Sequence, residues 1–571
     1  MADHKTLRTQ NISDALEDAF KNNNLVVLTG NTDDIFFNGE TNTRIELVLA
    51  SKAAEHGMPT VRYSLAGGAS AVVAQEGLAV RRLPQVAPED SPTISIDEIF
   101  QAMEQEGRPC LLVVDWADGL LPCSGANAST YETSRIMEQF ESRAVNYEFQ
   151  ASGHRIVLIS RAGSIDQRLL AMDGVATIDV SLPGETERRG AIERWLIHQE
   201  HPLFLEGSLA PDRLARAAGG MSLDSISRMR YSSTADKPLT MKTVLAEKRK
   251  VIARLAGDSL LVLDEARTFD EVAGLHNVKA YVNNQIGIGE TSLRLILAGP
   301  PGTGKNTVAI AIAHALDAVP VLLQSPLSKW VGESEQNMAN VFKIVESCGR
   351  VLLIIDEADQ GLLSKRADSA TSESSSVYPS LRGMIMSKTG DTGAPSELSI
   401  LALTNNPGGL DAAIRSRMIV LPVLEASSPG DRAHIMELKA TEKGVTLENG
   451  AAHAASTTFG QPIDGRQIQL ILNSARVSAH RRGSATVVAS DIEHALKRTH
   501  CVFGLTEQKA SMEAVLFTLP DDYMPWTAAW RAGITDYVPP TYLLPFIDMG
   551  TGDVDRDKLH THILDLRQAG Y

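Results

Sequence analysis

A glycine-rich run that ends in lysine is the segment of the sequence best suited to chemistry. It lies between the aliphatic run LRLILA and the helical pattern TVAIAIAHAL. Glycines let backbone N–H groups surround anionic oxygens, and a following helix adds the positive end of its dipole. A lysine at this position reaches the β- and γ-phosphates of a nucleotide. The sequence therefore predicts a nucleotide site, with a generic glycine-rich turn as the alternative. The run consists of Gly299, Pro300, Pro301, Gly302, Thr303, Gly304 and Lys305.

The residue after the lysine departs from the usual pattern of such loops. Asn306 stands where a Ser or Thr hydroxyl ordinarily binds Mg²⁺, and Thr307 comes one position later. An amide oxygen can also coordinate Mg²⁺, but it is bulkier and differently placed. We therefore expect a bound nucleotide with Mg²⁺ near Asn306, and hydrolysis that is slower than with a hydroxyl.

Two carboxylates follow an aliphatic run downstream of the loop. The segment VLLIIDEADQ ends its apolar part at Asp356 and Glu357. Ligands of open parallel sheets gather at the carboxyl ends of strands. Asp356 is placed to hold Mg²⁺, and Glu357 to orient or deprotonate an attacking water. A strand that simply ends in a solvated acidic turn is the alternative.

The elements that must position these groups form two similar stretches, at about 15–200 and about 266–428. In each, continuous aliphatic runs alternate with helical patterns, which is typical of parallel sheets covered by helices. More polar helical segments follow at about 203–232 and 429–499, and residues 241–255 fit an amphipathic connecting helix. The predicted fold class is α/β, with two parallel-sheet modules that are each followed by a small helical lid. The expected strands are 25–28, 111–114, 156–159, 293–298, 319–323, 351–355 and 400–403.

The two stretches also look like copies of one module. LLVVDWADGLL (111–121) corresponds to LLIIDEADQGLL (352–363), and VLISRAGSIDQRLL (157–170) to LALTNNPGGLDAAI (401–414). In the first copy no Gly-Lys loop precedes Asp115, Trp116 stands in the place of Glu357, and Ser160 in the place of Asn405. We therefore expect one intact site and one emptied site.

Composition narrows the classes of partner. The 571 residues carry 54 Lys+Arg against 70 Asp+Glu, a net charge of −16. An acidic chain is poorly suited to coating nucleic acid or an anionic membrane. Its four cysteines have no CxxC spacing, and its first twenty residues lack the apolar core of a secretory signal. We therefore expect a cytoplasmic protein with no membrane partner. Its net charge disfavours nucleic acid as a binding partner.

From here the sequence resembles the AAA+ ATPases, which bind ATP with Mg²⁺. TFDEVAGLHNVKAYV (268–282) is similar to the segment before the phosphate loop of AAA proteins, and LTNNPGGLDAAIRSRM (403–418) to their sensor and arginine-finger region. The resemblance implies that Asn405 is sensor 1, and that Arg415 and Arg417 are fingers that reach a neighbouring subunit's site. IDGRQIQLILNSA (463–475) resembles the lid helix with sensor 2, and a capping box from Asp464 to Gln467 places Arg466 in its first turn. The residues implied beside adenine are Val272, Ala273 and Gly274.

The resemblance also implies how the protein acts. SKWVGESE (328–335) is similar to the substrate-gripping pore loop of the protein-disassembling branch, with Lys329, Trp330 and Val331 as the grip. Trp330 packed in the core is the alternative. Fingers that act in trans imply a homo-oligomer, a hexameric ring. The implied function is ATP-driven remodelling, unfolding or disassembly of a protein client. An ATP-dependent assembly switch and a nucleic-acid motor are the alternatives.

The resemblance covers about 266–500, and the first module fits a degenerate AAA domain in outline. The tandem layout resembles plastid and cyanobacterial AAA proteins. The aromatic-rich tail, with Trp526 and Trp530, is expected to pack on the ATPase core or to dock a partner. A client or adaptor would bind the first domain or this tail. The expected domains are 1–202 (degenerate α/β), 203–265 (helical lid and linker), 266–428 (ATPase), 429–500 (helical lid) and 501–571 (C-terminal extension).

Overall fold

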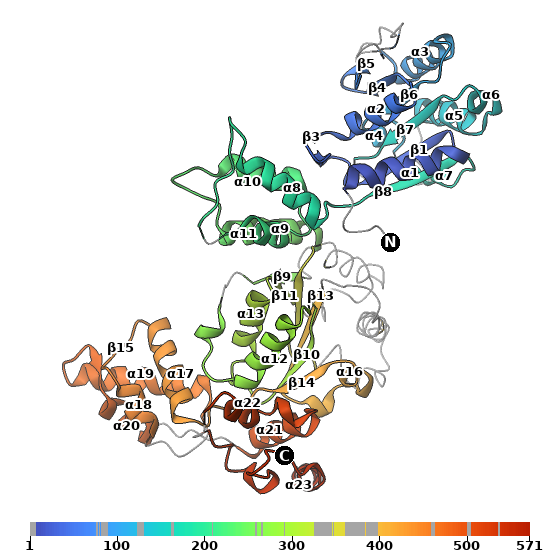
Figure 1. Ribbon diagram of the computed structural model, residues 1–571. Coiled ribbons are helices and arrows are strands. Elements are labelled where there is room, and N and C mark those ends of the chain that lie inside the picture. Colours follow the sequence, from blue (N-terminus) through green and yellow to red (C-terminus); the bar gives the residue numbers. More distant parts are fainter. Residues whose placement is uncertain are drawn as a thin grey trace. The chain divides into compact units, whose positions relative to one another are not determined.

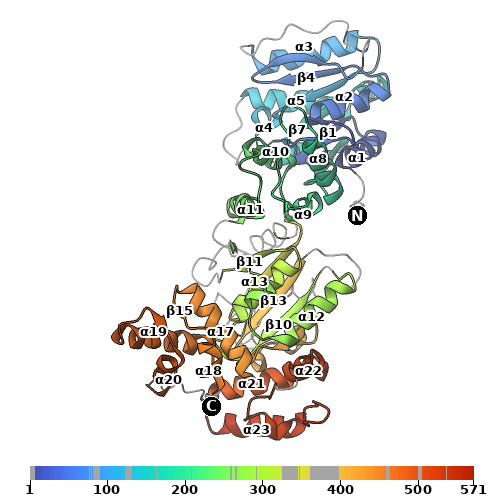
Figure 2. The same ribbon diagram turned by 60° about the vertical axis from the view of Figure 1, so that its left-hand side comes forward.

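The chain divides into two compact units, Met1–Val244 and Leu245–Tyr571, and each is described here by itself. The division falls inside the helix α11 (Met241–Ala256). Figures 1 and 2 show the elements of both units in a computed structural model. The structure describes residues 7–75, 78, 80, 90–122, 131–161, 165–207, 209–256, 260–263, 267–290, 292–324, 345, 348–359, 383, 398–457, 463–498, 504–534 and 537–570.

The first unit is built on a six-stranded sheet with the order β5-β4-β6-β7-β1-β8. Five of its strands are parallel, and β5 pairs antiparallel with β4 at one edge. Three of the inner strands, β1, β6 and β7, are largely aliphatic and mostly buried because helices cover both faces. The strands are β1 (Leu25–Gly30), β4 (Thr60–Ser64), β5 (Gly68–Val72), β6 (Leu111–Val114), β7 (Arg155–Ile159) and β8 (Val175–Val180), with the small hairpin β2 (Phe36–Phe37) and β3 (Asn42–Thr43).

Two groups of helices complete the first unit. One group flanks the sheet, and the other, from α8 onward, surrounds a separate core around the fully buried Trp195. The flanking helices are α1 (Arg8–Asn22), α2 (Ile45–Glu55), α3 (Pro92–Gln105), α4 (Ala117–Leu120), α5 (Tyr131–Val145), α6 (Tyr147–Ala151) and α7 (Gln167–Leu170). The second group is α8 (Glu185–Leu196), α9 (Pro211–Ala217), α10 (Leu223–Ser232) and the start of α11.

The second unit contains a sheet with the order β14-β10-β13-β12-β11-β9. Again five strands are parallel, and one short strand, β9, pairs antiparallel with the edge strand β11. Side chains alternate between two cores, so that Leu295 and Leu297 face the helices α12 and α13 while Ile296 and Ala298 face the opposite side. The strands are β9 (Leu260–Val262), β10 (Arg294–Ala298), β11 (Val319–Leu323), β12 (Val351–Ile355), β13 (Leu398–Thr404) and β14 (Ile419–Pro422).

The two sheets have the same order of parallel strands. The strands β4-β6-β7-β1-β8 of the first correspond one by one to β11-β12-β13-β10-β14 of the second. Each sheet carries one antiparallel strand beyond the same edge. This shared order is what duplication of one module would produce, and it supplies a register for comparing the two sites residue by residue.

Helices of the second unit fall into three groups. The helices that flank the sheet are α12 (His276–Gly287), α13 (Lys305–Ala315) and the short α16 (Ala412–Arg415). A helical subdomain with its own apolar core follows β14. It consists of α17 (Pro429–Glu442), α18 (Ala451–Thr457), α19 (Gly465–Arg481) and α20 (Ala489–Arg498), with the short strands β15 (Thr446–Leu447) and β16 (Thr486–Val487). Short 3-10 turns lie at η2 (Phe269–Glu271), η5 (Pro407–Gly409), η6 (Asp521–Tyr523) and η7 (Leu544–Phe546).

The C-terminal extension packs on the sheet and helices of the second unit, in line with the first of the two expectations for the aromatic-rich tail. It contains α21 (Leu505–Phe517), α22 (Pro525–Arg531) and α23 (Arg556–Gln568). Trp526 is fully buried, and its indole N–H donates to the carbonyl of Gly552 at 2.9 Å. Burying a large aromatic side chain stabilises a fold by about 2–3 kcal/mol. The extension is therefore an integral layer of the second unit (Figure 1).

Among the described residues, none of the helices has both the length and the apolar character that crossing a membrane requires.

Candidate functional site

The phosphate loop joins the carboxyl end of β10 to the amino end of α13, as predicted. Gly299, the first residue after β10, has a φ of 156°, and a Cβ there would lie 2.1 Å from the carbonyl oxygen of Val423. Gly302 and Gly304 both have left-handed φ angles, of 84° and 93°. Only glycine fits such close approach and such angles without strain. The glycines of the sequence therefore lie where the loop must bend.

Lys305 begins α13 and turns its side chain back into the loop. Its ammonium donates to the carbonyls of Gly299 (2.8 Å) and Pro300 (2.7 Å) and to the Oδ1 of Asn405 (2.8 Å). Burial, opposed by the charge of Asp356 and aided by the charge of Arg466, lowers the pKa of Lys305 to about 8. The ammonium is therefore poorly solvated, and among the described residues it has no anionic partner at hydrogen-bond distance. A phosphate in the loop would supply one.

The two carboxylates follow β12, which is separated in the sheet by β13 from the strand β10 that leads into the loop. Glu357 has a left-handed φ of 48°, and its N–H donates to the Oδ1 of Asp356 at 2.8 Å. The Nδ2 of Asn306 lies 3.4 Å from the Oδ2 of Asp356. Amide and carboxylate oxygens are both ligands that Mg²⁺ accepts, so this donor pair fits that ion if the Asn306 amide turns its oxygen toward it.

The helical subdomain touches the phosphate loop directly. The capping box predicted for α19 is confirmed, because Asp464 accepts from the N–H groups of Arg466 (2.7 Å) and Gln467 (2.8 Å). The N–H of Gly465 donates to the carbonyl of Gly302 at 3.0 Å. The cap thus fixes the first turn of the lid helix against the loop. Arg466 enters the site from this turn.

One cavity of about 340 Å³ brings most of the predicted residues together. At the phosphate-loop end it collects residues from the loop, from the ends of β12 and β13, and from the lid. Charged and amide groups dominate this end, which suits a polyphosphate. The residues concerned are Pro301, Gly302, Thr303, Gly304, Lys305, Asn306, Thr307, Asp356, Glu357, Asn405 and Arg466.

The rest of the lining mixes apolar with charged residues and includes residues that the sequence did not single out. Val272, Ala273 and Gly274 line it, which is compatible with the place beside adenine that the resemblance implied. Glu425 had a sequence signal, since it follows the apolar run IVLPVL much as Asp356 follows its own strand. Tyr537 had only the aromatic enrichment of the tail. The lining residues that were not predicted are Arg267, Glu271, Leu275, His276, Leu424, Glu425, Ala426, Asp431, Ile435, Leu438, Lys439, Glu442, Ile463, Gly465, Gln469, Pro525 and Tyr537.

Arg415 and Arg417 are not among the residues that line this cavity. Arg415 donates to the carbonyls of Pro407 (3.1 Å) and Leu410, and its guanidinium lies 4.6 Å from the centre of the Phe517 ring. Arg417 is exposed and donates to the carbonyl of Ala413 at 2.8 Å. Neither arginine therefore contributes to the wall of this cavity. The predicted pore-loop residues Lys329, Trp330 and Val331 lie outside the described residues.

In the first unit, the segment after β6 corresponds to the segment after β12. It has a similar backbone conformation but different side chains. Trp116 repeats the left-handed conformation of Glu357, with a φ of 56°, and its N–H donates to the Oδ1 of Asp115 at 3.0 Å. The Ser160 hydroxyl donates to Asp118, as the hydroxyl of Thr404 does to Asp359. Ser160 is thus the counterpart of Thr404, and its expected match to Asn405 is wrong by one residue.

Strand register identifies the true counterpart of Asn405. Val114 pairs with Leu158 in the first sheet, and Ile355 pairs with Ala402 in the second. Counting onward from these pairs, Arg161 takes the place of Asn405. Part of the expectation for the first copy was therefore wrong, because a charged residue does stand in the sensor position. The error arose from a one-residue difference in loop length after the strand.

The guanidinium of Arg161 places a positive charge at this end of the first sheet. Its guanidinium is 8% exposed and reaches Asp115 (2.8 Å), Glu46 (2.7 Å) and Asp33 (2.8 Å). Arg62 forms a second ion pair with Asp115. Burial acts to raise the pKa of Asp115, but the hydrogen bond from Arg62 and the charge of Arg161 outweigh it and lower that pKa. The carboxylate that would face Mg²⁺ in an intact site is already neutralised.

Replacing Arg161 with methionine should destabilise the first unit by about 3 kcal/mol, because removing one partner leaves buried carboxylates without their counter-charge. Arg168→Met is the matched control: Arg168 pairs with Asp166 at 2.9 Å, but its side chain is 67% exposed. We expect the control to cost less than about 0.5 kcal/mol. Hydrogen exchange of the β6 and β7 amides in the full chain measures both. Equal protection in the two variants would contradict this account of Arg161.

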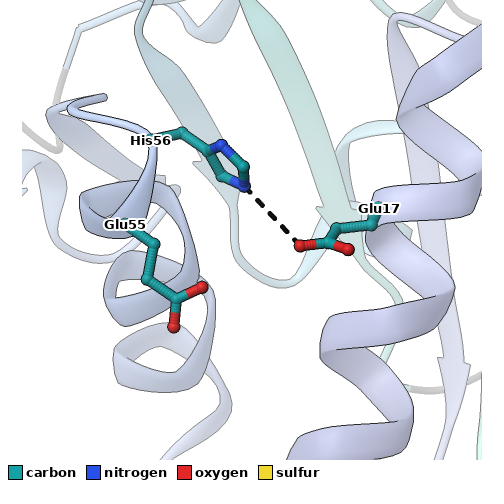
Figure 3. A group of neighbouring side chains, drawn as sticks. All are labelled: Glu17, Glu55 and His56. Atoms are coloured by element: carbon teal, nitrogen blue, oxygen red, sulfur yellow. Dashed lines mark ion pairs between the residues drawn. The ribbon is translucent and has the colours of Figure 1, made fainter.

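A second group of ionisable side chains lies elsewhere on the first unit. Glu17, Glu55 and His56 are the one group among the described residues whose ligand atoms are close enough to hold a metal ion (Figure 3). The His56 Nε2 lies 3.8 Å from Glu17. However, the ammonium of Lys52 already pairs with both Glu17 and Glu55. The cluster is exposed and carries its own cation, so we assign it no metal.

Two known protein families match this chain, one over the region of each sheet. Residues 13–181 match "AAA+ chaperone, N-terminal Rossmann-like domain". Residues 295–422 match "ATPase family associated with various cellular activities (AAA)", and they contain the phosphate loop and the Asp356-Glu357 pair.

Individual relatives match more of the chain at low identity. Cell division control protein 48 homolog B of Arabidopsis thaliana is 23% identical over 63% of this chain and 61% of its own length. A proteasome-activating nucleotidase of Methanococcus vannielii is 29% identical over 35% of this chain and 49% of its own. Vacuolar protein sorting-associated protein 4 of Dictyostelium discoideum is 28% identical over 30% and 40%. The chain thus spans roughly half the length of these curated relatives.

Proposed function

From the premise that this chain is an AAA-type ATPase, we propose that its second unit hydrolyses ATP and that the energy remodels, unfolds or disassembles a protein client. One observation carries the proposal. The phosphate loop, the Asp356-Glu357 pair, Asn405 and the lid residue Arg466 converge on a single cavity from four separate segments. Such convergence of a cation, carboxylates and a neutral amide suits phosphoryl transfer to water.

Each group has a distinct task in this proposal. Lys305, freed from its three oxygen partners, neutralises the β- and γ-phosphates. Glu357 accepts the proton of the attacking water or orients it, and Asn405 holds that water or the γ-phosphate without adding charge. Asp356 and Asn306 would hold Mg²⁺, which supplies neutralising charge to the phosphates when bound. Arg466 couples the nucleotide to the lid, since the same turn contacts the loop.

Completion of the site in trans is the second part of the proposal. Arg415 and Arg417 do not line their own subunit's cavity, which suits fingers that neutralise phosphate charge in a neighbouring subunit. This arrangement requires a homo-oligomer, and we propose a hexameric ring. Lys329, Trp330 and Val331 would line its pore, and Trp330 would grip an extended polypeptide because its ring offers apolar area with few torsions to freeze.

The first unit and the C-terminal extension are the proposed contacts for a client or adaptor, in a cytoplasmic setting. Arg161 fills the first unit's vestigial site, which suits a scaffold better than hydrolysis. A Trp330→Ala variant tests the grip: turnover of ATP should persist while remodelling of the client is lost. Full remodelling by this variant would refute the pore-loop role.

An assembly switch is the second candidate, and Asn306 favours it. Its amide lies 3.4 Å from Asp356, so the two groups proposed for Mg²⁺ already contact each other. In this alternative ATP binding orders the ring and turnover stays slow. A nucleic-acid motor has no specific support, and only strong stimulation of turnover by DNA or RNA, without stimulation by protein, would favour it.

Asn306→Thr separates the motor from the switch. Threonine restores a hydroxyl at the position that ordinarily binds Mg²⁺. For a motor that already turns over, we expect Mg²⁺-dependent phosphate release to change by less than about fivefold, roughly 1 kcal/mol in activation free energy. A gain of about 100-fold would instead support the switch. The measurement is steady-state phosphate release at saturating ATP, with Lys305→Ala as the baseline.

A further inference from the structure

The C-terminal extension reaches the nucleotide cavity, although it follows the lid by many residues. Pro525 and Tyr537 line the same cavity as the phosphate loop. Tyr537 packs on His276, which follows the cavity-lining residues Val272, Ala273 and Gly274 in the sequence. The extension therefore reaches the part of the cavity where the resemblance places the base of a nucleotide.

Tyr537 is held firmly at this position. Its side chain is 6% exposed, and its ring meets the His276 ring edge to face, with centroids 6.3 Å apart and an interplanar angle of 87°. The Tyr537 carbonyl accepts from the indole N–H of Trp530 at 2.9 Å. His276 in turn lies 3.4 Å from Asp431 at the start of the lid. Tyr537 thus joins three walls of the cavity: the segment before the phosphate loop, the lid and the extension.

Glu425 ties the cavity wall to the extension at a second point. It follows β14, lines the cavity and is 2% exposed. Its Oε1 accepts from the hydroxyl of Tyr542, and its Oε2 from the hydroxyl of Ser511 at 3.4 Å. Tyr542 and Ser511 both belong to the extension. Burial raises the pKa of Glu425 to about 7, and the hydrogen bonds from Tyr542 and Ser511 act against this rise.

We propose that the C-terminal extension is a working part of the nucleotide site, in which Tyr537 packs against the purine base and Tyr542 positions the wall residue Glu425. This inference rests on the proposed binding of ATP by the second unit and extends it to the base. Tyr537 contacts the ligand, whereas Tyr542 is a positioning residue that acts through Glu425. Docking of the extension and nucleotide affinity are then linked.

The linkage makes a distinctive prediction, because the extension should affect the base and not the phosphates. Contact between a base and an aromatic side chain contributes about 1–3 kcal/mol, which corresponds to a change of roughly 5- to 150-fold in affinity. Tripolyphosphate carries the phosphate chain without a base. Loss of the Tyr537 ring should therefore lower the affinity for ADP and leave the affinity for tripolyphosphate unchanged.

The test is calorimetric titration of the full chain with ADP and, separately, with tripolyphosphate. We expect Tyr537→Leu to lower the affinity for ADP about 10-fold or more and to change the affinity for tripolyphosphate by less than twofold. Tyr537→Phe keeps the ring and should bind both ligands within twofold of the wild type. Tyr542→Phe, which removes the hydroxyl that holds Glu425, should weaken ADP about threefold or more and leave tripolyphosphate unchanged.

Tyr523→Leu is the matched control. Tyr523 also belongs to the extension and packs on Tyr281 with ring centroids 5.0 Å apart, but it does not line the cavity. This variant should bind both ligands normally. Unchanged ADP binding by Tyr537→Leu, or an equal loss of both ligands in that variant, would overturn the inference. Failure of the wild type to bind ADP at all would instead overturn the proposed function.

Discussion

Replacing Lys305 with alanine should weaken ADP and ATP binding by about 100-fold or more. The Lys305 ammonium donates to three neutral oxygens in and beside the phosphate loop, at 2.7–2.8 Å, and has no anionic partner there within the part of the chain that the structure describes. Removing one member of a buried charge pair costs about 2–5 kcal/mol. Isothermal calorimetry with the full chain measures the change.

The control for this prediction is Lys443→Ala. Lys443 is an exposed lysine of the same unit, just beyond the end of α17, and it does not line the cavity. Its loss should leave affinity within twofold of the wild type. If Lys305→Ala bound nucleotide as well as Lys443→Ala did, the glycine-rich run would not be a phosphate loop.

Replacing Glu357 with glutamine should keep ATP binding and reduce turnover by about 100-fold or more. The amide preserves the size of the side chain and its left-handed backbone site, but it cannot accept the proton of the attacking water. The expected variant therefore holds ATP in an intact cavity without cleaving it. ATP affinity within threefold of the wild type is the internal control, and a comparable loss of binding would show that Glu357 has a structural role instead.

The same variant should retain its client. A ring that is held in the ATP state keeps its grip, so Glu357→Gln should co-purify with a protein partner in ATP, and release it in ADP. Lys305→Ala should not retain that partner under either condition. Identical retention by the two variants would mean that the contact does not depend on nucleotide state.

Inner strands were the part of the fold that the sequence predicted best. The expected runs 111–114, 319–323 and 351–355 coincide with β6, β11 and β12 because a strand buried on both faces is aliphatic at every position. The strands β4, β5, β8, β9 and β14 were missed. β4 and β8 mix polar with apolar residues, whereas β14 begins the apolar run IVLPVL, which could have been interpreted as a strand.

The site could be predicted from the sequence where a local motif determines the geometry. The glycines of the loop, the carboxylate pair and the capping box of α19 each need only neighbours in sequence. Arg161 and Tyr537 show why the rest was not. The identity of Arg161 as the counterpart of Asn405 depends on strand register, and the place of Tyr537 depends on packing between segments more than 250 residues apart.

Steady-state phosphate release by the full chain, measured with and without Mg²⁺, tests the central claim most directly. The account predicts that wild-type turnover requires Mg²⁺ and clearly exceeds that of Lys305→Ala and Glu357→Gln, both of which fall to background. Wild-type turnover no higher than that of Lys305→Ala would contradict the claim that the second unit drives remodelling by hydrolysing ATP.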